Sequence, residues 1–371
     1  MDRFYDIVSN EKDLEPLFSI KQLPVFQGCV THPIEQDLKE DLNFYISRSS
    51  GMVQLSPVLP LELIYQTDHN TGAIGQIWID HHKEFSRFLL KYNPTCVFEI
   101  GGSHGILSKT CHDTNPNIDW TIIDPAPNPI DGLSSKIING FFNRDTVIPP
   151  DVDMIVHSHV LEHIYDPSGL FDKLSQLPLG THLCFSIPNL SKSIEGKFTN
   201  ALSFEHTYFC TEEYVRYWLA KSRFSLIKMQ EFGDHSVFYS AVRSETAPIS
   251  MPKNYEKNKK LFTEFVDYHS ENIFKLNQYI KNTTLPVYLF GGHVFSQALL
   301  AMGLEEESIV AVLDNSIQKQ NRRLYGTRLT VYSPKILAEI DEAVVILQAG
   351  QYTEEIRKDI IDNINARIIF I

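Results

Sequence analysis

A glycine-rich turn carries the first residues whose spacing suggests chemistry. Residues 97–107 read VFEIGGSHGIL, so an apolar run holding Glu99 leads into Gly101, Gly102, Ser103 and Gly105. Glycines let backbone N–H groups approach a ligand that side chains would otherwise block. A second apolar run ends about 20 residues further on in Asp124, which Pro125 follows, and a carboxylate at this spacing suits the two hydroxyl groups of a ribose. The pattern predicts a nucleotide-like ligand at the turn.

Residues 153–164, DMIVHSHVLEHI, form the strongest local signature. The apolar run predicts a strand that delivers Ser158 and His159 to the same sheet edge as the glycine turn, where open α/β sheets bind ligands. The alternation of His157 and His159 suggests a metal site. However, the two side chains face opposite sides of a strand, and no acid or cysteine is spaced to join them.

The other histidines and the cysteines do not predict a metal site either. His81 and His82 lie in a helical pattern, and we interpret them as ordinary helix residues because no partner ligand has metal-binding spacing. The five cysteines are scattered singly without a C-x-x-C pair, which supports neither a disulfide framework nor a zinc ribbon. We therefore predict no metal ligands.

An acid–base pair, Glu205 and His206, lies between an apolar run at 181–187 and a helical pattern that opens at Thr211. An imidazole beside a carboxylate suits a general base, because the acid orients the ring and stabilises its protonated form. The alternative is a histidine that packs over the site with only a structural role. Both interpretations stay open at this point.

The composition bounds the class of protein. The 371 residues suggest two or three domains, and 43% hydrophobic with 11% aromatic residues are enough for sizeable cores. The net charge of −13, without a run of Lys or Arg, argues against a nucleic-acid partner. No apolar run reaches about 18 residues and no signal peptide is found, so we expect a cytoplasmic protein with no membrane partner.

The order of the apolar runs predicts a small module followed by an α/β unit. Residues 1–72 form the module, with a hairpin of 43–46 and 52–55. Residues 73–245 begin with a helix inside 72–92 and then alternate helices with strands at 96–100, 119–123, 136–138, 153–158 and 181–187. They end in an antiparallel hairpin of 224–231 and 236–242. This is the pattern of a doubly wound α/β sheet.

A second α/β unit over residues 252–371 follows a polar linker at 243–260. Its strand 287–290 runs into Gly291, Gly292 and His293, and its strand 309–313 ends at Asp314, which echoes the first glycine turn and its acid. Gly291, Gly292 and His293, together with Lys319 and Arg322, could hold the phosphates of an acceptor. The alternative is a packing turn and two solvated cations.

These motifs resemble those of S-adenosylmethionine-dependent methyltransferases of class I. An acid two residues before the first glycine resembles their motif I, the segment SHVLEH at 158–163 resembles their motif IV, and an antiparallel final strand is typical of their sheet. The whole chain is similar to the three-part deoxysugar C-methyltransferases, which act on nucleotide-linked keto-sugars. That similarity also includes GMVQL at 51–55, the helix entry at 71–82, Glu205-His206, LDN at 313–315, Lys319-Gln320 and YGT at 325–327.

The resemblance implies a class I methyltransferase Rossmann-like sheet that binds S-adenosylmethionine, a small N-terminal module and a Rossmann-like C-terminal domain for the acceptor. Glu99 and the glycine turn would hold the methionine and ribose portions, and Asp124 the ribose hydroxyls. Glu205 and His206 match the family's base pair, which removes a proton next to the ketone. Tyr208 would contact the acceptor, a nucleotide-linked or phosphorylated sugar. We expect a monomer or homodimer.

The sequence departs from this family at two places. The family's N-terminal module holds a zinc through cysteines, two of them where this chain reads ISRSS at 46–50, so we expect that zinc to be missing. The family commonly has a Tyr upstream of the Glu-His pair and two residues between the His and the next Tyr. Here ALSF at 201–204 precedes the pair, and only Thr207 separates His206 from Tyr208. The alternatives are O-methylation of a sugar or phosphorylated glycan precursor, an NAD(P)-dependent oxidoreductase, and a non-catalytic nucleotide-binding partner.

Overall fold

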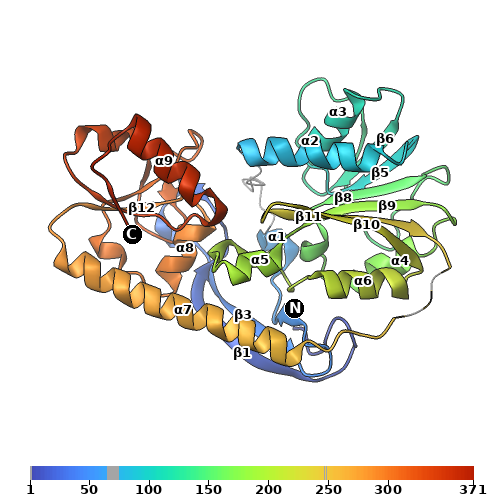
Figure 1. Ribbon diagram of the computed structural model, residues 1–371, viewed down its shortest axis with the longest axis horizontal. Helices are drawn as coiled ribbons and strands as arrows, with labels where there is room; N and C mark the ends of the chain where they lie inside the picture. Colours follow the sequence, from blue (N-terminus) through green and yellow to red (C-terminus); the bar gives the residue numbers. More distant parts are fainter. Residues whose placement is uncertain (1, 65–74, 246, 248) are drawn as a thin grey trace.

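The computed structural model describes residues 2–64, 75–245, 247 and 249–371, which form sheets of three, seven, five and two strands (Figure 1). The predicted module boundary at 72–73, the start of the predicted helix at Gly72, part of the 71–82 segment and Pro248 of the linker lie outside these residues. Within the described parts, no helix is both long enough and apolar enough to cross a membrane.

The N-terminal sheet has the order β1–β3–β4, with β1 at Leu14–Pro24, β3 at Lys39–Ser47 and β4 at Val53–Leu55. The predicted hairpin is confirmed, because Phe44 pairs with Leu55 across antiparallel strands. The sequence did not predict β1. Register shifts after Pro16 and Ile20 break the alternation of polar and apolar residues by which a strand is recognised. A short helix, α1 at Leu61–Ile64, follows.

The seven-stranded sheet has the order β10–β11–β9–β8–β5–β6–β7. Its strands are β5 Cys96–Ile100, β6 Asp119–Asp124, β7 Lys136–Asn139, β8 Met154–Ser158, β9 His182–Pro188, β10 Phe224–Phe232 and β11 Ser236–Arg243. All pairs are parallel except those of β11. The predicted α/β sheet with a final antiparallel hairpin is confirmed. The strand order reverses at β5, and ligands bind at such switch points in open α/β sheets.

Helices cover both faces of this sheet (Figure 1). They are α2 Gln76–Leu90, α3 Ile106–His112, α4 Pro167–Leu174, α5 Leu190–Glu195 and α6 Glu212–Lys221. Alternate residues of β5 point to opposite faces. Val97 therefore joins the core formed with α2 and α3, while Phe98 joins the core that contains Phe171 of α4 and Trp218 of α6.

The C-terminal unit begins with a 28-residue helix, α7 at Tyr255–Asn282. The linker predicted at 243–260 therefore extends too far, because α7 already begins at Tyr255. The first turns of α7 are polar, with only Asn258 and Phe262 buried, so the sequence did not distinguish them from a linker. A parallel sheet follows in the order β15–β13–β12–β16–β17. Its elements are β12 Val287–Phe290, α8 Val294–Ala301, β13 Ala311–Leu313, β15 Val331–Tyr332, β16 Val344–Ile346, α9 Thr353–Asn363 and β17 Ile369–Phe370.

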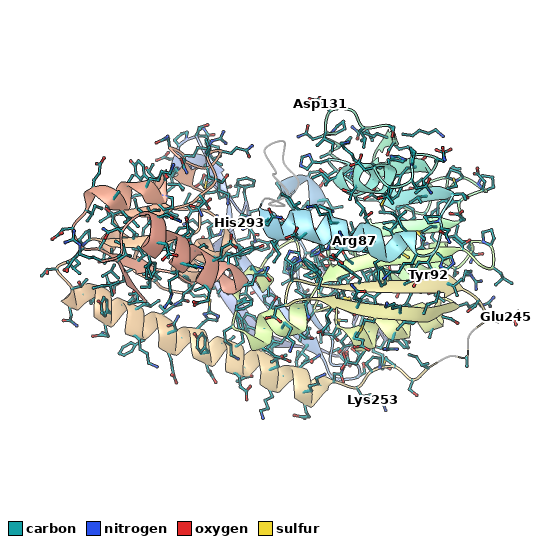
Figure 2. All side chains as sticks on the ribbon, turned by 45° about the horizontal axis from the view of Figure 1, so that its top comes forward. Arg87, Tyr92, Asp131, Glu245, Lys253 and His293 are labelled. Carbon is teal, nitrogen blue, oxygen red and sulfur yellow. The ribbon has the colours of Figure 1, made fainter. Side chains whose placement is uncertain are left out.

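The N-terminal module joins the two α/β units. Its β2, Cys29–Val30, pairs with β14, Arg323–Leu324, of the C-terminal unit. The side chain of Asp37 is 1% exposed. It accepts hydrogen bonds from both terminal nitrogens of Arg323 and from the N–H of Gly326. The result is a C-terminal unit held next to the central one. In Figure 2, His293 lies on the side of the C-terminal unit that is turned toward α2.

Candidate active site

A cavity of about 1030 Å³ lies between the carboxyl edge of the central sheet and the C-terminal unit. Most residues predicted for the site line it, namely Glu99, Gly101, Gly102, Ser103, Asp124, Pro125, Ser158, His159, Glu205, His206, Gly291, His293 and Lys319. Gly105 and Tyr208, which were also predicted, are not among the lining residues. One cavity therefore brings together the predicted cofactor residues, the predicted base and the C-terminal turn.

The glycine turn follows β5 directly and leaves no space for side chains. Gly101 has φ +76°, and a Cβ atom there would lie 2.5 Å from Cγ2 of Val160. Gly105 has φ +71°, a left-handed conformation at the N-cap of α3, and a Cβ atom would lie 2.6 Å from Cδ2 of Leu133. Gly105 thus shapes the turn without lining the cavity. The turn presents backbone to the cavity, as a cofactor cradle requires.

Asp124 connects the end of β6 to the glycine turn. Its Oδ2 accepts a hydrogen bond from the N–H of Ser103 at 2.9 Å, and its Oδ1 accepts one from the N–H of Ala126 at 2.8 Å. Each carboxylate oxygen can accept a further hydrogen bond. Asp124 is therefore fixed in place and still able to bind two hydroxyl groups, so the residues present fit a ribose.

Glu99 is 3% exposed and accepts a hydrogen bond from Nε1 of Trp120 at 2.8 Å. Burial raises the pKa of Glu99 to about 7; the Trp120 hydrogen bond opposes this rise, and the charge of Asp124 adds to it. A carboxyl group with this pKa gains a proton near neutral pH. A nearby cation favours its charged form, so Glu99 fits the positively charged methionine portion of S-adenosylmethionine.

Two carboxylates and two imidazoles form a group that lines the same cavity as the glycine turn. His163 lies between Glu162 and Glu205, with Nε2 3.6 Å from Oε1 of Glu162 and Nδ1 3.6 Å from Oε2 of Glu205. The ring of His206 lies edge-on to that of His163, with 5.4 Å between centroids. Glu205, predicted to orient His206, thus lies next to His163, and His163 lies next to His206.

The two imidazoles of this group differ in their pKa. Burial lowers the pKa of His206 to about 3, helped by the charge of His163 and opposed by a hydrogen bond to the backbone of Ala201. Burial also acts to lower the pKa of His163, but Glu162 and Glu205 outweigh it, so the pKa of His163 is raised above the ordinary value. His163, which sequence reasoning did not single out, is the stronger base of the two.

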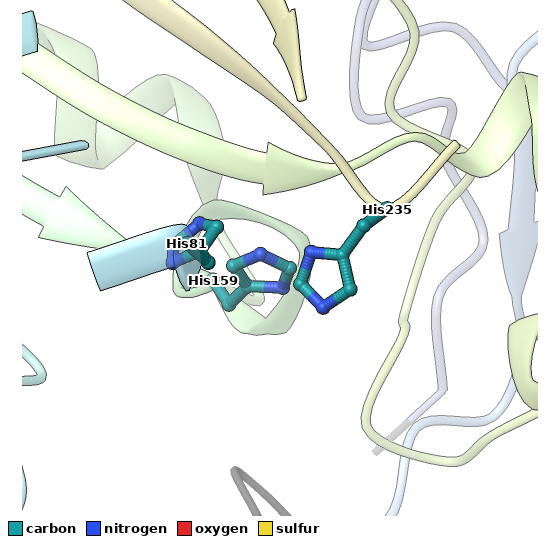
Figure 3. A group of neighbouring side chains, drawn as sticks. All are labelled: His81, His159 and His235. Atoms are coloured by element: carbon teal, nitrogen blue, oxygen red, sulfur yellow. The ribbon is translucent and has the colours of Figure 1, made fainter. Parts of the chain in front are cut away.

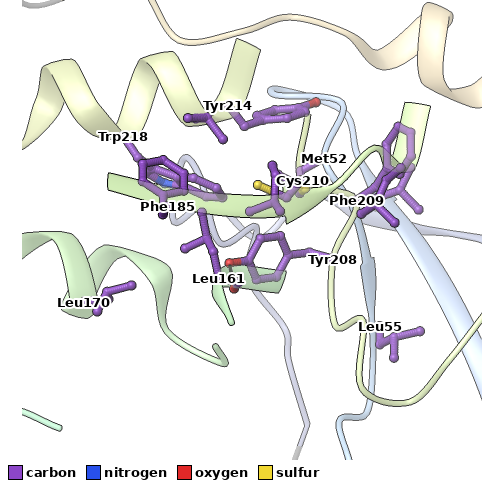
Figure 4. Packing of buried hydrophobic residues seen from close by; sticks show 14 of the residues in the cluster. Met52, Leu55, Leu161, Leu170, Phe185, Tyr208, Phe209, Cys210, Tyr214 and Trp218 are labelled. Carbon is purple, nitrogen blue, oxygen red and sulfur yellow. Dashed lines mark hydrogen bonds between the residues drawn. The ribbon is translucent and has the colours of Figure 1, made fainter. Parts of the chain in front are cut away.

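Tyr208, predicted to contact the acceptor, belongs to the hydrophobic core. It is 1% exposed, its hydroxyl group donates a hydrogen bond to the backbone oxygen of Leu161, and its ring packs edge-on against Trp218 (Figure 4). The residue also forms a β-bridge with Gln54 of the N-terminal sheet. Its role is to join the module to the central unit, and the prediction of an acceptor contact is wrong.

Three histidines gather at the wall of the cavity. His81 of α2, His159 after β8 and His235 between β10 and β11 lie next to one another (Figure 3), and each offers a ring nitrogen within 4.8 Å of the other two. The expectation that no partner stands at metal-ligand spacing is therefore incorrect for His81 and His159. Their partners come from distant parts of the sequence, which spacing along the chain cannot reveal.

The C-terminal turn repeats the hydrogen bonds of the first. Oδ2 of Asp314 accepts from the N–H of Gly292 at 2.8 Å, and Oδ1 accepts from the N–H of Ser316 at 2.8 Å. Asp124 accepts in the same way from the turn and from the residue two positions on. One difference is that Nζ of Lys319 lies 3.2 Å from Asp314. The predicted echo is thus a real repetition of geometry.

The place where the resembling family holds zinc contains serines and carboxylates. Ser47 donates hydrogen bonds to Asp6 and Asp13, at 3.1 and 3.2 Å, and the N–H of Ser49 donates to Asp13 at 2.6 Å. The hydroxyl groups of Ser47 and Ser49 are 3.1 Å apart. These contacts tie the start of the chain to the loop after β3.

Comparison with known proteins gives two matches along the chain. Residues 76–240 match a family model described as a methyltransferase domain, and residues 241–371 match the C-methyltransferase C-terminal domain. Similar solved structures include human N-acetylserotonin methyltransferase with SAM, at 17% identity, 46% of this chain, 52% of that chain and TM-score 0.38. Another is a Burkholderia thailandensis 1,6-didemethyltoxoflavin-N1-methyltransferase, with 13% sequence identity and a TM-score of 0.37. The match covers 46% of this chain and 82% of that one. The chain spans about half the length of the first. No curated protein matches.

The fold, the site and the match over residues 76–240 identify this part of the chain as a methyltransferase domain. The C-terminal part identifies the chain more closely. Residues 241–371 match the C-methyltransferase C-terminal domain, so the chain combines this domain with a methyltransferase domain.

Proposed function

We propose that this enzyme transfers a methyl group from S-adenosylmethionine to the carbon next to the ketone of a nucleotide-linked sugar or a related glycan precursor. The observation that carries the proposal is the shared cavity of about 1030 Å³, which the glycine turn, the His163 group and the C-terminal turn all line. The C-methyltransferase C-terminal domain supports carbon as the methylated atom. O-methylation of a sugar or phosphorylated precursor is the alternative outcome.

S-adenosylmethionine would supply a methyl group bound to a positively charged sulfur. Glu99 and the backbone of the turn at Gly101 would hold its methionine portion, and Asp124 would accept hydrogen bonds from its ribose. Ser158 and His159, at the end of β8, line the same cavity and would cover the side of the cofactor that faces the acceptor. Removing water from this side would favour transfer to the acceptor over other reactions.

The His163 group would supply the base. His163 would take the proton from the acceptor carbon, whose electron pair would form the bond to the methyl group, and the electrons of the methyl–sulfur bond would stay with the departing sulfur. Glu205 stabilises the imidazolium that forms, since it is 3.6 Å away. His206 lies beside the ring and positions the acceptor, while Glu205 acts through His163.

The C-terminal turn would bind the far end of the acceptor. Gly291, His293 and Lys319 line the cavity and come from the repeated acid-and-turn geometry. A cation and backbone groups at a turn before a helix suit the phosphates of a sugar nucleotide. The N-terminal module holds this turn at its distance from the methyl donor through β2 and Asp37.

Calorimetry with S-adenosylmethionine, S-adenosylhomocysteine and NADH tests the cofactor. We expect both sulfur compounds to bind, and Gly101→Ala to abolish binding because its Cβ atom would clash with Val160. Gly180→Ala is the matched control, since Gly180 also has a positive φ, +91°, but nothing lies within 4 Å of the added atom. Binding of NADH alone would refute the proposal.

A screen of nucleotide-linked keto-sugars with radiolabelled S-adenosylmethionine tests the acceptor. NMR of the product then distinguishes a new C–CH₃ group from an O–CH₃ group. We expect His163→Asn to abolish transfer while cofactor binding is retained. Full turnover by that variant would refute the assignment of the base.

A further inference from the structure

A group of three histidines lies beside the cavity, and two of them, His81 and His235, have no task in the proposed reaction, while His159 lines the cofactor side of the cavity. His81 lies on α2, His159 follows β8, and His235 lies in the turn between β10 and β11 (Figure 3). The ligand atoms of the three rings lie within 4.8 Å of one another. We propose that His81, His159 and His235 bind one divalent transition-metal ion, and that Zn²⁺ matches this set best.

The spacing of the rings suits a single ion. The centroids of the three rings are 5.3, 5.4 and 5.4 Å apart, so the rings form a nearly equilateral triangle. Three imidazoles bound to one tetrahedral zinc, with Zn–N bonds of about 2.1 Å, hold their ring centres about 5 Å apart. Imidazole nitrogen is a preferred ligand of Zn²⁺, and three protein ligands leave one position for water or a ligand in the cavity.

The ring of His81 gives the strongest evidence for a bound ion. This ring is fully buried, and neither Nδ1 nor Nε2 has a hydrogen-bond partner among the described residues. A neutral imidazole has one N–H donor and one acceptor nitrogen, and buried polar groups of proteins are almost always paired. The ring of Trp78 packs against all three histidines, with centroid distances of 5.3, 4.8 and 4.6 Å to His81, His159 and His235, and its one polar atom is a donor that cannot accept a hydrogen bond. A metal ion would satisfy the acceptor nitrogen.

Groups around the other two rings resemble those that orient metal-bound histidines. The hydroxyl group of Ser236 lies 2.9 Å from Nε2 of His159 and also contacts Nδ1 of His235. One nitrogen of each ring therefore contacts Ser236, and the other nitrogen remains for an ion. Hydroxyl groups in such places fix the ring orientation and the tautomer of metal ligands.

The three ligands come from different elements of the central unit. Because His159 and His235 line the cavity, the ion would tie α2 to the central sheet at the cavity wall.

The test uses the full-length protein without a histidine tag, stripped of metal with a chelator. Calorimetric titration with ZnCl₂ should give one bound ion per chain, and CoCl₂ should give the visible absorption of tetrahedral cobalt. His81→Asn and His235→Asn should each weaken Zn²⁺ binding by more than about 100-fold. Zn²⁺ should raise the unfolding temperature of the wild type and not that of these variants.

His206→Asn is the matched control, because His206 belongs to a second group of potential ligands with Glu162 and His163. The affinity of the His206→Asn variant for Zn²⁺ should equal that of the wild type. Absence of stoichiometric binding would overturn the proposal. Loss of binding in His206→Asn, or wild-type affinity in folded His235→Asn, would also overturn it. His235 lies in the turn between β10 and β11, so His235→Asn can test the metal site even if His81→Asn, in the buried face of α2, does not fold. Metal binding needs no turnover, so this result is independent of the proposed reaction.

Discussion

Replacement of Glu205 by glutamine tests whether a charge beside His163 creates the base. Oε2 of Glu205 lies 3.6 Å from Nδ1 of His163, and the side chains of the two residues are only 19% and 20% exposed. Two unit charges about 4 Å apart attract each other by about 1 kcal/mol in water and by about 4 kcal/mol near a protein surface. Glutamine keeps the size of the side chain and removes the charge. The variant therefore destabilises protonated His163 by an energy in this range.

The pH dependence gives the sign of the effect. Burial acts to lower the pKa of His163, and Glu162 and Glu205 raise it above the ordinary value. Glu205→Gln should move the NMR titration midpoint of the His163 Cε1–H signal, assigned with His163→Asn, to lower pH. Transfer requires the unprotonated ring, so the acid limb of kcat/KM should move to lower pH as well. The plateau should fall at least about fivefold, which corresponds to about 1 kcal/mol.

Glu195→Gln is the control, because Glu195 is an exposed carboxylate of α5 that faces Lys192. It should change neither the midpoint nor the plateau. Folding of both variants is checked by circular dichroism. An unchanged midpoint in folded Glu205→Gln would refute the reasoning, and so would a uniformly lower rate with an unmoved acid limb, because a purely structural lesion has that effect.

Two further predictions concern the cofactor site and the N-terminal module. Asp124→Asn should weaken S-adenosylmethionine binding in calorimetry about 10- to 100-fold, because hydrogen bonds to charged groups contribute about 1.5–3 kcal/mol; unchanged affinity would exclude the ribose contact. Asp37→Ala should lower the free energy of unfolding in urea by about 3 kcal/mol, because it removes the partner of Arg323. Asp41→Ala, at the exposed pair with Lys21, should leave stability nearly unchanged. Equal effects of the two substitutions would contradict the role of Asp37.

The glycine turn could be predicted because its geometry is local. The strand, the turn and the helix follow each other within 97–107, and Asp124 lies at the end of the neighbouring parallel strand. The same holds for the C-terminal turn and Asp314. In these cases the residue spacing along the chain fixes the distance in space, so a pattern of glycines and acids is sufficient to identify the site.

The histidine groups could not be predicted because their contacts join distant segments. His81, His159 and His235 come from a helix, a strand end and a hairpin, and only the packing of these elements brings them together. Glu205 pairs with His163 rather than with its neighbour in sequence for the same reason. Adjacency in sequence therefore did not predict the contact that Glu205 makes.

The two repeated turns differ in charge, and this difference suits two different ligands. Asp124 has no cationic partner among the described residues, so its negative charge remains available for hydroxyl donors and for a cofactor with a positively charged sulfur. Asp314 lies 3.2 Å from Nζ of Lys319, so the second turn carries an almost neutral pair. A neutral pair does not repel phosphate, whereas an unpaired carboxylate does. This difference in charge supports the proposed placement of the methyl donor at the first turn and of a phosphorylated acceptor at the second.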